Sequence, residues 1–209
     1  MDTSNLMSGL IGAVVGGFLS FLGSWYSSKR ILKTEEERAN QSRIIEKQNR
    51  DIDLILNFDD RFSSESFMRI RSKAAGSIEL FREDLVATKR KMPESSSSSD
   101  TLIRILHDTS TVKEDVFDFF EGVGLVFRRY NLDEELVWST FFYWVQGYWQ
   151  AAAEYISVTR KNDNTIWEDF EYLYHQLSEI EKKKRKCTDT DLVLDEGYIL
   201  DFLENEKHL

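Results

Sequence analysis

The sequence has few residues that would interrupt a helix or crosslink the chain. Pro93 is the only proline among 209 residues, and five of the ten glycines lie within the first 25 positions. Because proline and glycine are the main helix breakers, we expect long helices. The single cysteine, Cys187, excludes an intrachain disulfide, which fits either a reducing compartment or a core that needs no crosslink.

Positive charge is also in short supply. The chain carries 27 Lys and Arg against 37 Asp and Glu, which gives a net charge of -10 and a pI of about 4.9. Nucleic-acid binding depends on clustered cations that neutralise phosphates. The composition therefore argues against direct nucleic-acid binding and leaves only binding through a partner.

The residue patterns of common enzymes are missing. His107, His175 and His208 lie far apart and form no HExxH motif, and neither a glycine-rich phosphate loop nor a GxSxG motif occurs. We therefore expect no catalytic residues, no cofactor and no metal site.

One long apolar segment stands out among the features that are present. Residues 6–26 contain no charged side chain, and a helix of this length spans about 31 Å, close to the thickness of a bilayer core. A cleaved signal peptide is the alternative, but Met1–Asn5 contains Asp2 and no basic residue. Trp25 and Tyr26 suit the membrane interface. Residues 1–28 are thus predicted to form a transmembrane anchor.

Basic residues follow the predicted span at once. Lys29, Arg30 and Lys33 lie directly after it. By the positive-inside rule this end of the span faces the cytoplasm, which places the N-terminus outside.

Small residues recur along the predicted span at helical spacing. One row consists of Ser8, Gly12, Gly16, Ser20 and Ser24, and a second consists of Gly9, Ala13 and Gly17. Small residues every four positions allow close helix packing in lipid. They predict self-association or packing on a partner span.

The rest of the chain reads as helical. Residues 29–57 predict a juxtamembrane stalk, in which Ile45, Ile52 and Ile55 give a weak heptad signal; a solvated single helix is the alternative. Residues 58–186 predict a helical bundle interrupted by a Ser-rich linker at 93–100, and residues 187–209 form an acidic tail. The expected fold class is all-α: a transmembrane helix, a stalk helix and a small bundle.

Individual helices can be placed by their caps and apolar faces. Ser63–Glu65 resembles the start of a helix that ends near Lys91, and Asp133 starts a long helix that ends near Arg160. A short helix is expected from Asp100 or Thr101 to about His107, and the acidic tail is read as a short helix that packs on a neighbour.

Contacts can be predicted for two groups of charged residues. Glu121 and Glu154 lie among aromatic positions, and buried carboxylates need partners, for which Arg69, Arg71, Arg128 and Arg160 are the candidates. The one basic run is Lys182, Lys183, Lys184, Arg185 and Lys186. It could contact anionic lipid or an acidic partner. The alternative is a solvated helix end that balances the acidic tail.

Several motifs resemble a known family. They are Asp60-Arg61-Phe62, Phe119-Phe120-Glu121, Leu132-Asp133-Glu134-Glu135-Leu136, Tyr148-Trp149 and Phe170-Glu171-Tyr172-Leu173. Together they resemble a bacterial and phage family catalogued only as a domain of unknown function, over roughly residues 50–180. The resemblance implies one N-terminal span and a helical domain. Together with the topology given by Lys29, Arg30 and Lys33, it leads us to expect a location in the bacterial inner membrane, with the N-terminus outside and the helical domain in the cytoplasm. It implies no reaction.

The functional expectation follows from the span and the bundle. We expect a membrane-anchored, self-associating interaction or scaffold protein that contacts the lipid bilayer, its own copies and a protein partner through the bundle. The alternative is a membrane effector of a bacterial anti-phage system, in which the span forms a pore or depolarises the membrane.

Overall fold

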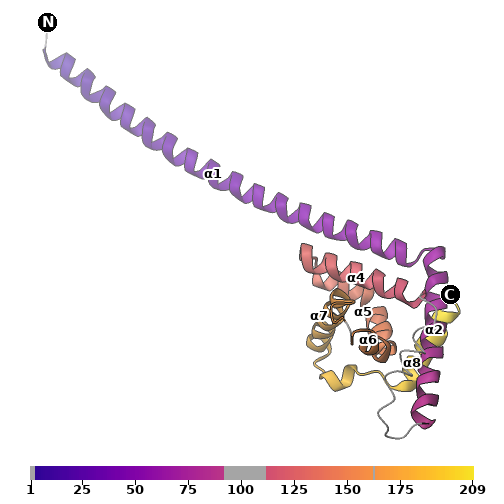
Figure 1. Ribbon diagram of the computed structural model, residues 1–209. Helices are drawn as coiled ribbons and strands as arrows, with labels where there is room; N and C mark the ends of the chain where they lie inside the picture. Colours follow the sequence, from indigo (N-terminus) through magenta and orange to yellow (C-terminus); the bar gives the residue numbers. More distant parts are fainter. Residues whose placement is uncertain (1–2, 92–111, 162) are drawn as a thin grey trace. The chain divides into compact units, whose positions relative to one another are not determined.

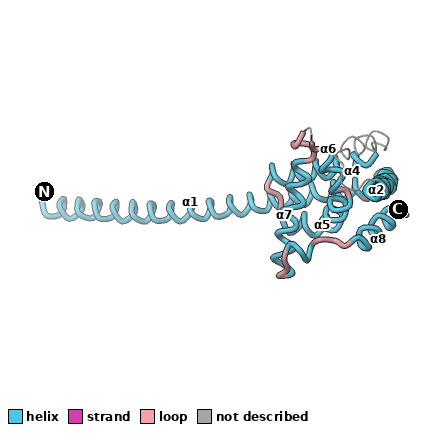
Figure 2. The backbone as a smooth tube through the Cα atoms, turned by 60° about the horizontal axis from the view of Figure 1, so that its bottom comes forward, coloured by secondary structure: helices cyan, strands magenta, loops and turns pink. Residues whose placement is uncertain are grey.

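The computed structural model describes residues 3–91, 112–161 and 163–209 (Figure 1). Side chains are described for Trp25, Lys33 and residues 35–88, 114–161 and 163–209. Every regular element in these stretches is a helix, and none of them contains a strand (Figure 2). The predicted all-α class is confirmed.

The chain divides into two units, residues 1–50 and residues 51–209. Helix α1, Thr3–Phe62, makes up the first unit and ends inside the second. Among the residues open to this test, no helix has both the length and the apolarity of a membrane span. Apart from Trp25, the side chains of the predicted span at residues 6–26 lie outside the described residues. The linker at 93–100 and the expected short helix after it lie outside them as well.

The second unit contains the end of α1 and seven further elements in the described stretches. They are α2 Glu65–Lys91, α4 Val112–Tyr130, α5 Glu134–Ala151, α6 Ala153–Thr159, α7 Glu168–Arg185, the 3-10 turn η1 Asp189–Leu192, and α8 Glu196–Lys207. Helices α4 and α7 pack together, α2 covers α4, and α5 lies on α7. Helix α8 lies against α2 and α5.

Short polar residues start three of these helices, as their chemistry requires. Free backbone N–H groups at a helix start need acceptors. The hydroxyl of Ser64 accepts from the N–H of Phe67 at 3.3 Å, and the carboxylate of Asp133 accepts from the N–H of Leu136 at 3.0 Å. Asp195 does the same for Tyr198 at 2.8 Å. The predicted starts of α2 and α5 are thereby confirmed, and the acidic tail does form a packed helix.

An aromatic cluster around Phe62 holds the second unit together. The Phe62 ring is fully buried, with ring centroids of Phe119 and Phe120 at 5.2 and 5.6 Å. Trp144 lies 5.1 Å away on another side. Such pairs contribute about 0.5–1.5 kcal/mol each beyond the burial of apolar area. The last turn of α1 is therefore a central part of this core.

The long helix predicted from Asp133 to Arg160 is wrong in one respect, because it is two helices. Helix α5 ends at Ala151, and Ala152 leaves the helical backbone at φ -100° and ψ 4°. A guanidinium N–H of Arg82 in α2 donates to the carbonyl of Ala151 at 3.0 Å. This carbonyl would otherwise accept within the helix, so a contact from a distant helix accompanies the break. No proline or glycine marks it.

The weak heptad in the stalk does not form one face. Ile55 is buried in the second unit at 2% exposure, whereas Ile45 and Ile52 are 56% and 43% exposed. Ile52 and Leu56, at 54%, instead lie on the solvent side of α1. The apolar residues of this helix thus serve two different surfaces.

Candidate functional site

The small-residue rows predicted to pack the span lie outside the described side chains, as do Lys29 and Arg30. These are Ser8, Gly9, Gly12, Ala13, Gly16, Gly17, Ser20 and Ser24. Lys33 is described and is exposed.

The basic run forms the C-terminal end of α7, where cations favour the helix dipole. Lys182 bonds Asp189 at 2.7 Å and also pairs with Glu179, and these bonds raise its pKa to about 12. Lys184 pairs with Glu135 of α5. Lys183 and Lys186 are exposed, so their ammonium groups lie in solvent.

A buried carboxylate, Glu181, lies beneath this run. It is only 1% exposed and accepts from the indole N–H of Trp138 at 2.9 Å. Its Oε1 forms an ion pair, though no hydrogen bond, with Arg185, whose side chain is 71% exposed. The ammonium of Lys184 lies 3.8 Å from the centre of the Trp138 ring. Part of the basic run therefore has a structural role.

A second buried carboxylate joins α8 to the rest of the unit. Glu206 and Arg71 are 5% and 4% exposed. The guanidinium donates two hydrogen bonds to this carboxylate, from Nε at 2.9 Å and from Nη2 at 2.7 Å. Such forked pairs are the strongest arginine–carboxylate contacts because both donors match both oxygens.

Further groups complete the surroundings of Arg71 and Glu206. The hydroxyl of Tyr148 donates to Glu206 at 2.6 Å, and burial together with the carboxylate raises the pKa of Tyr148 well above 10. The Arg71 guanidinium also donates to the carbonyl of Phe62 at 3.3 Å and lies 4.0 Å from the centre of its ring. This network ties α8 to α2, α5 and the end of α1.

The close approach of α8 to α5 depends on a glycine. A Cβ added at Gly147 would lie 2.4 to 2.7 Å from three atoms of the Phe202 ring, closer than carbon atoms can approach. On α2, Ser72 donates to the carbonyl of Lys207 at 2.7 Å, and Glu79 pairs with the ammonium of Lys207 at 2.7 Å. We call Arg71, Ser72, Glu79, Gly147 and Tyr148 the α8 seat.

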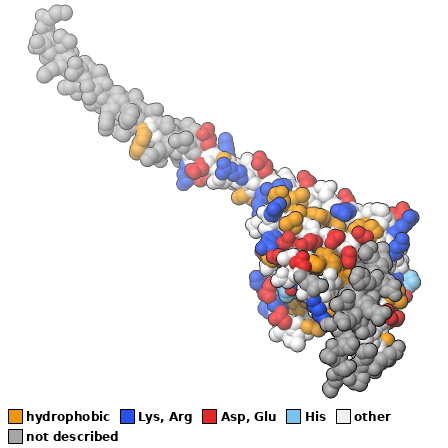
Figure 3. Space-filling model, viewed as in Figure 1, with side chains coloured by type: hydrophobic (Ala, Val, Ile, Leu, Met, Phe, Trp, Pro, Cys, Tyr) orange, Lys and Arg blue, Asp and Glu red, His pale blue; other side chains and the backbone are white. Residues whose placement is uncertain are grey.

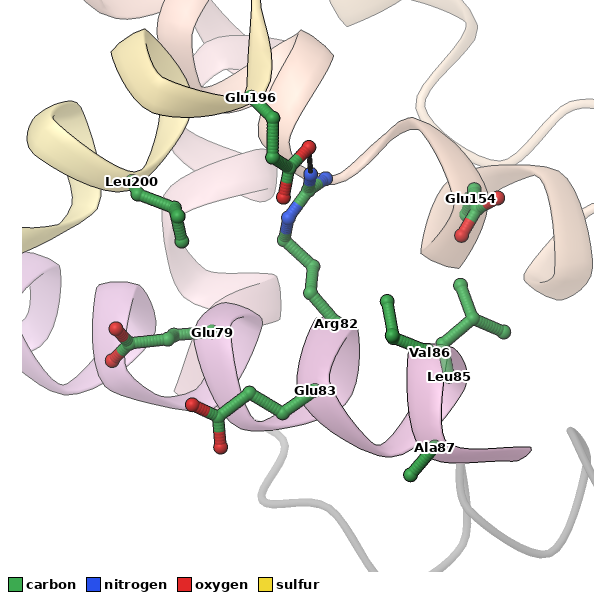
Figure 4. A pocket seen from close by; sticks show the side chains of 9 residues that line it. All are labelled: Glu79, Arg82, Glu83, Leu85, Val86, Ala87, Glu154, Glu196 and Leu200. Atoms are coloured by element: carbon green, nitrogen blue, oxygen red, sulfur yellow. Dashed lines mark hydrogen bonds and ion pairs between the residues drawn. The ribbon is translucent and has the colours of Figure 1, made fainter. Parts of the chain in front are cut away.

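A pocket of about 810 Å³ opens beside the first turn of α8 (Figure 4). Its lining residues are Glu79, Arg82, Glu83, Leu85, Val86 and Ala87 from α2, Glu154 from α6, and Glu196 and Leu200 from α8. Arg82 reaches across it to pair with Glu196. The Nε atom of Arg82 is buried without a hydrogen-bond partner. The lining is mixed, with four carboxylates around one guanidinium, and it joins α2, α6 and α8.

The predicted ion pair between Glu121 and an arginine is not formed among the described residues, although the charge of Arg160 is close enough to act on Glu121. Glu154 is exposed, so the expected burial of its carboxylate is wrong. Arg69 pairs with Glu65, Arg128 with Glu168 and Asp169, and Arg160 with Glu171. Glu121 instead accepts from the backbone N–H of Phe170 at 2.7 Å and caps α7, and its pKa is raised mainly by burial. Glu154 lines the pocket. The main hydrogen-bond donor to Glu121 is thus the start of α7, and sequence spacing cannot show that this helix start lies beside Glu121.

The contribution of Glu206 was not foreseen, although a signal for it exists. Ile199, Phe202, Leu203 and Glu206 follow the i, i+3, i+4, i+7 pattern, and all four are buried. A carboxylate on the apolar face of a helix demands a cationic partner. That inference points to a buried arginine without identifying Arg71.

The titratable groups of the described stretches include no candidate metal site. No group of three or more His, Cys, Asp or Glu in this part of the chain could hold a metal ion. His175 and His208 lie largely exposed beside Glu171 and Glu204. The visible face of the second unit carries both signs of charge, intermixed (Figure 3). The clearest built feature is therefore the contact of α8 with its seat.

Comparison with known protein families gives a match over most of the chain. The model of a family described as a domain of unknown function (DUF4760) matches residues 10–177, which include α2, α4, α5 and α6 and exclude α8. No curated protein and no solved structure matches the chain.

Proposed function

The chain belongs to the DUF4760 family, whose description assigns no activity, so we propose a function from its own chemistry: it is a membrane-anchored protein that self-associates through α1 and presents a helical interaction unit in the cytoplasm of a bacterium. It acts by binding other proteins and catalyses no reaction.

The anchor is supported by the sequence of the first 33 residues. Residues 6–26 lack charge over a length that suits a bilayer core, and Lys29, Arg30 and Lys33 follow directly. This order places the following residues on the cytoplasmic side. The exposed Lys183 and Lys186 at the end of α7 are available for anionic lipid headgroups.

The observation that carries self-association is an apolar row on the solvent side of α1. Ile45, Ile52 and Leu56 are each between 43% and 56% exposed, and spacings of seven and four residues place them on one helix face. Large apolar side chains that recur on one exposed helix face, here separated by Gln48 and Asn49, favour a contact surface. A second copy anchored in the same membrane carries the same apolar row, and its α1 runs in the same direction. This arrangement allows the two helices to pair in parallel.

Co-purification of two differently tagged full-length copies from detergent tests this proposal. The variant Ile45→Glu/Ile52→Glu/Leu56→Glu is expected to lose the second tag, because charges would line the shared face. Leu80→Glu is the matched control, since Leu80 is 60% exposed on α2 and lies outside the row. If the triple variant retains the second tag as well as the control does, the row is not the contact.

A second candidate function is a membrane effector of an anti-phage system. It is favoured by the rows of glycine and serine in the predicted span, which suit assembly of helices within lipid. An effector would depolarise cells on overexpression, and Gly12→Leu/Gly16→Leu would restore the membrane potential. Wild-type cells with the potential of an empty-vector control would exclude this function.

A further inference from the structure

The surface that holds α8 has the properties of a specific helix-binding site. Its members, the α8 seat, come from α2 and α5, within the residues that match the family. Helix α8 lies outside the match and approaches the seat after a separate connection. The α8 seat is thus a binding site, and α8 is its ligand within the same chain.

The chemistry of the seat selects one kind of occupant. Arg71 and Tyr148 both donate to the carboxylate of Glu206, and a buried guanidinium without this counter-charge would be costly. The ring of Phe202 packs directly against Gly147, and no side chain at position 147 would fit between them. The seat therefore fits an amphipathic helix that carries an aromatic ring and, one turn later, a carboxylate.

The connection before α8 has the features of a hinge. Lys186, directly after α7, has a left-handed backbone with φ 54°, which residues other than glycine rarely adopt. The turn η1 that follows is bonded to α5, because Gln146 and Gln150 donate to the carbonyl of Leu192 at 2.8 and 2.9 Å. Residues 187–209 therefore dock as one segment, and Lys186 is the point at which this segment joins α7. Opening at Lys186 relieves the unfavourable φ and lets the whole segment after it leave its own copy.

We propose that the α8 seat binds α8 of a second copy of this chain, with residues 187–209 exchanged between copies. The proposal rests on the proposed self-association, which supplies the neighbour. A second copy carries an identical helix, so the contacts with Arg71, Tyr148 and Gly147 are all remade in the partner. Exchange of an identical element preserves every contact and changes only the connection, which makes it a low-cost route to an assembly. A shared membrane raises the effective concentration of the second helix.

Crosslinking between two tagged full-length chains tests the exchange. In a Cys187→Ser background, one tagged chain carries Ser72→Cys and the other carries Lys207→Cys, because the Ser72 hydroxyl bonds the Lys207 carbonyl at 2.7 Å. Both chains are co-expressed and treated with a short thiol-specific crosslinker. The matched control replaces Ser72→Cys by Lys73→Cys, the next residue of α2, which is exposed. A single chain with both Ser72→Cys and Lys207→Cys reports docking within one copy.

The expected result is a crosslinked heterodimer at least tenfold more abundant with Ser72→Cys than with Lys73→Cys. Chains that co-purify but crosslink only within the doubly substituted copy would overturn the exchange and leave self-association intact. Equal yields with Lys73→Cys would show random collision and would also overturn it. If the two tags do not co-purify at all, the proposed self-association fails, and the exchange fails with it.

Discussion

Two buried carboxylates of this protein have similar partners and different surroundings. Glu206 accepts from Tyr148 and pairs with Arg71, and Glu181 accepts from Trp138 and pairs with Arg185. Both aromatic donors lie on α5. The difference is the cation: the Arg71 side chain is buried, whereas that of Arg185 is mostly in water. Of these two sites, only the one at Glu206 holds a whole ion pair away from solvent, so the two should respond very differently to loss of a partner.

The largest expected difference comes from removing each carboxylate. Glu206→Ala leaves a buried guanidinium without its counter-charge and should lower the free energy of unfolding by about 3–5 kcal/mol. Glu181→Ala leaves Arg185 in solvent and should cost about 1 kcal/mol. Urea unfolding of the full chain in detergent, followed by far-UV circular dichroism, measures both. Equal losses would show that burial of the cation does not separate the two sites.

The next largest loss of stability is expected when Tyr148, the aromatic donor to Glu206, is replaced. Tyr148→Phe removes a hydrogen bond to a charged group and should cost about 1.5–3 kcal/mol. Tyr143→Phe is the control, because Tyr143 is partly exposed on the same helix.

The pH dependence of the same variant adds a second measurement. Since the pKa of Tyr148 is raised well above 10 in the folded state, its contribution to stability is full below pH 10 and is lost as the pH rises further. Wild type should therefore lose stability above pH 10 more steeply than Tyr148→Phe. Parallel curves would contradict the raised pKa.

The shape of the α8 seat can be tested apart from its charge. Gly147→Ala introduces a Cβ that collides with the Phe202 ring and should cost about 1–3 kcal/mol. Gly122→Ala, in α4, meets no atom within 4 Å and should raise the free energy of unfolding by about 0.5–1 kcal/mol. A harmless Gly147→Ala would mean that α8 does not approach α5 as closely as described.

The smallest effect on stability is expected at a third carboxylate, Glu121. Burial raises the pKa of Glu121, so its contribution to stability is present below pH 4.5 and is lost as the pH rises. Glu121→Gln keeps an acceptor for the N–H of Phe170 and removes this slope. Between pH 4 and 7 the variant should gain on wild type by less than about 1 kcal/mol, after allowance for solvent screening. Identical profiles of unfolding against pH would disprove the shift.

The fold class and several helix starts followed from the sequence because they depend on local chemistry. Ser64 and Asp133 cap their helices through bonds to residues three positions later, and the scarcity of proline and glycine leaves the intervening stretches helical. The apolar spacing of α8 likewise predicted a packed helix in the acidic tail. Such features need no knowledge of distant neighbours.

The polar contacts between helices could not be read in the same way. Arg71 and Glu206 lie 135 residues apart, and nothing in the sequence favours this pairing over Arg71 with Glu121 or Glu154. The break at Ala152 involves Arg82, 69 residues from the carbonyl that it contacts. In the candidate site, the carboxylate on the apolar face of α8 was visible in advance, but its partner on α2 required the fold.

The contact between Gly147 and Phe202 has a consequence for variation among relatives. A side chain at position 147 collides with a ring at position 202, so we expect the two positions to vary together. A relative with alanine or a larger residue at 147 should carry a small residue at 202 or lack α8 altogether. Position 147 is thus a marker, readable from sequence alone, of whether a member of the family carries this C-terminal helix.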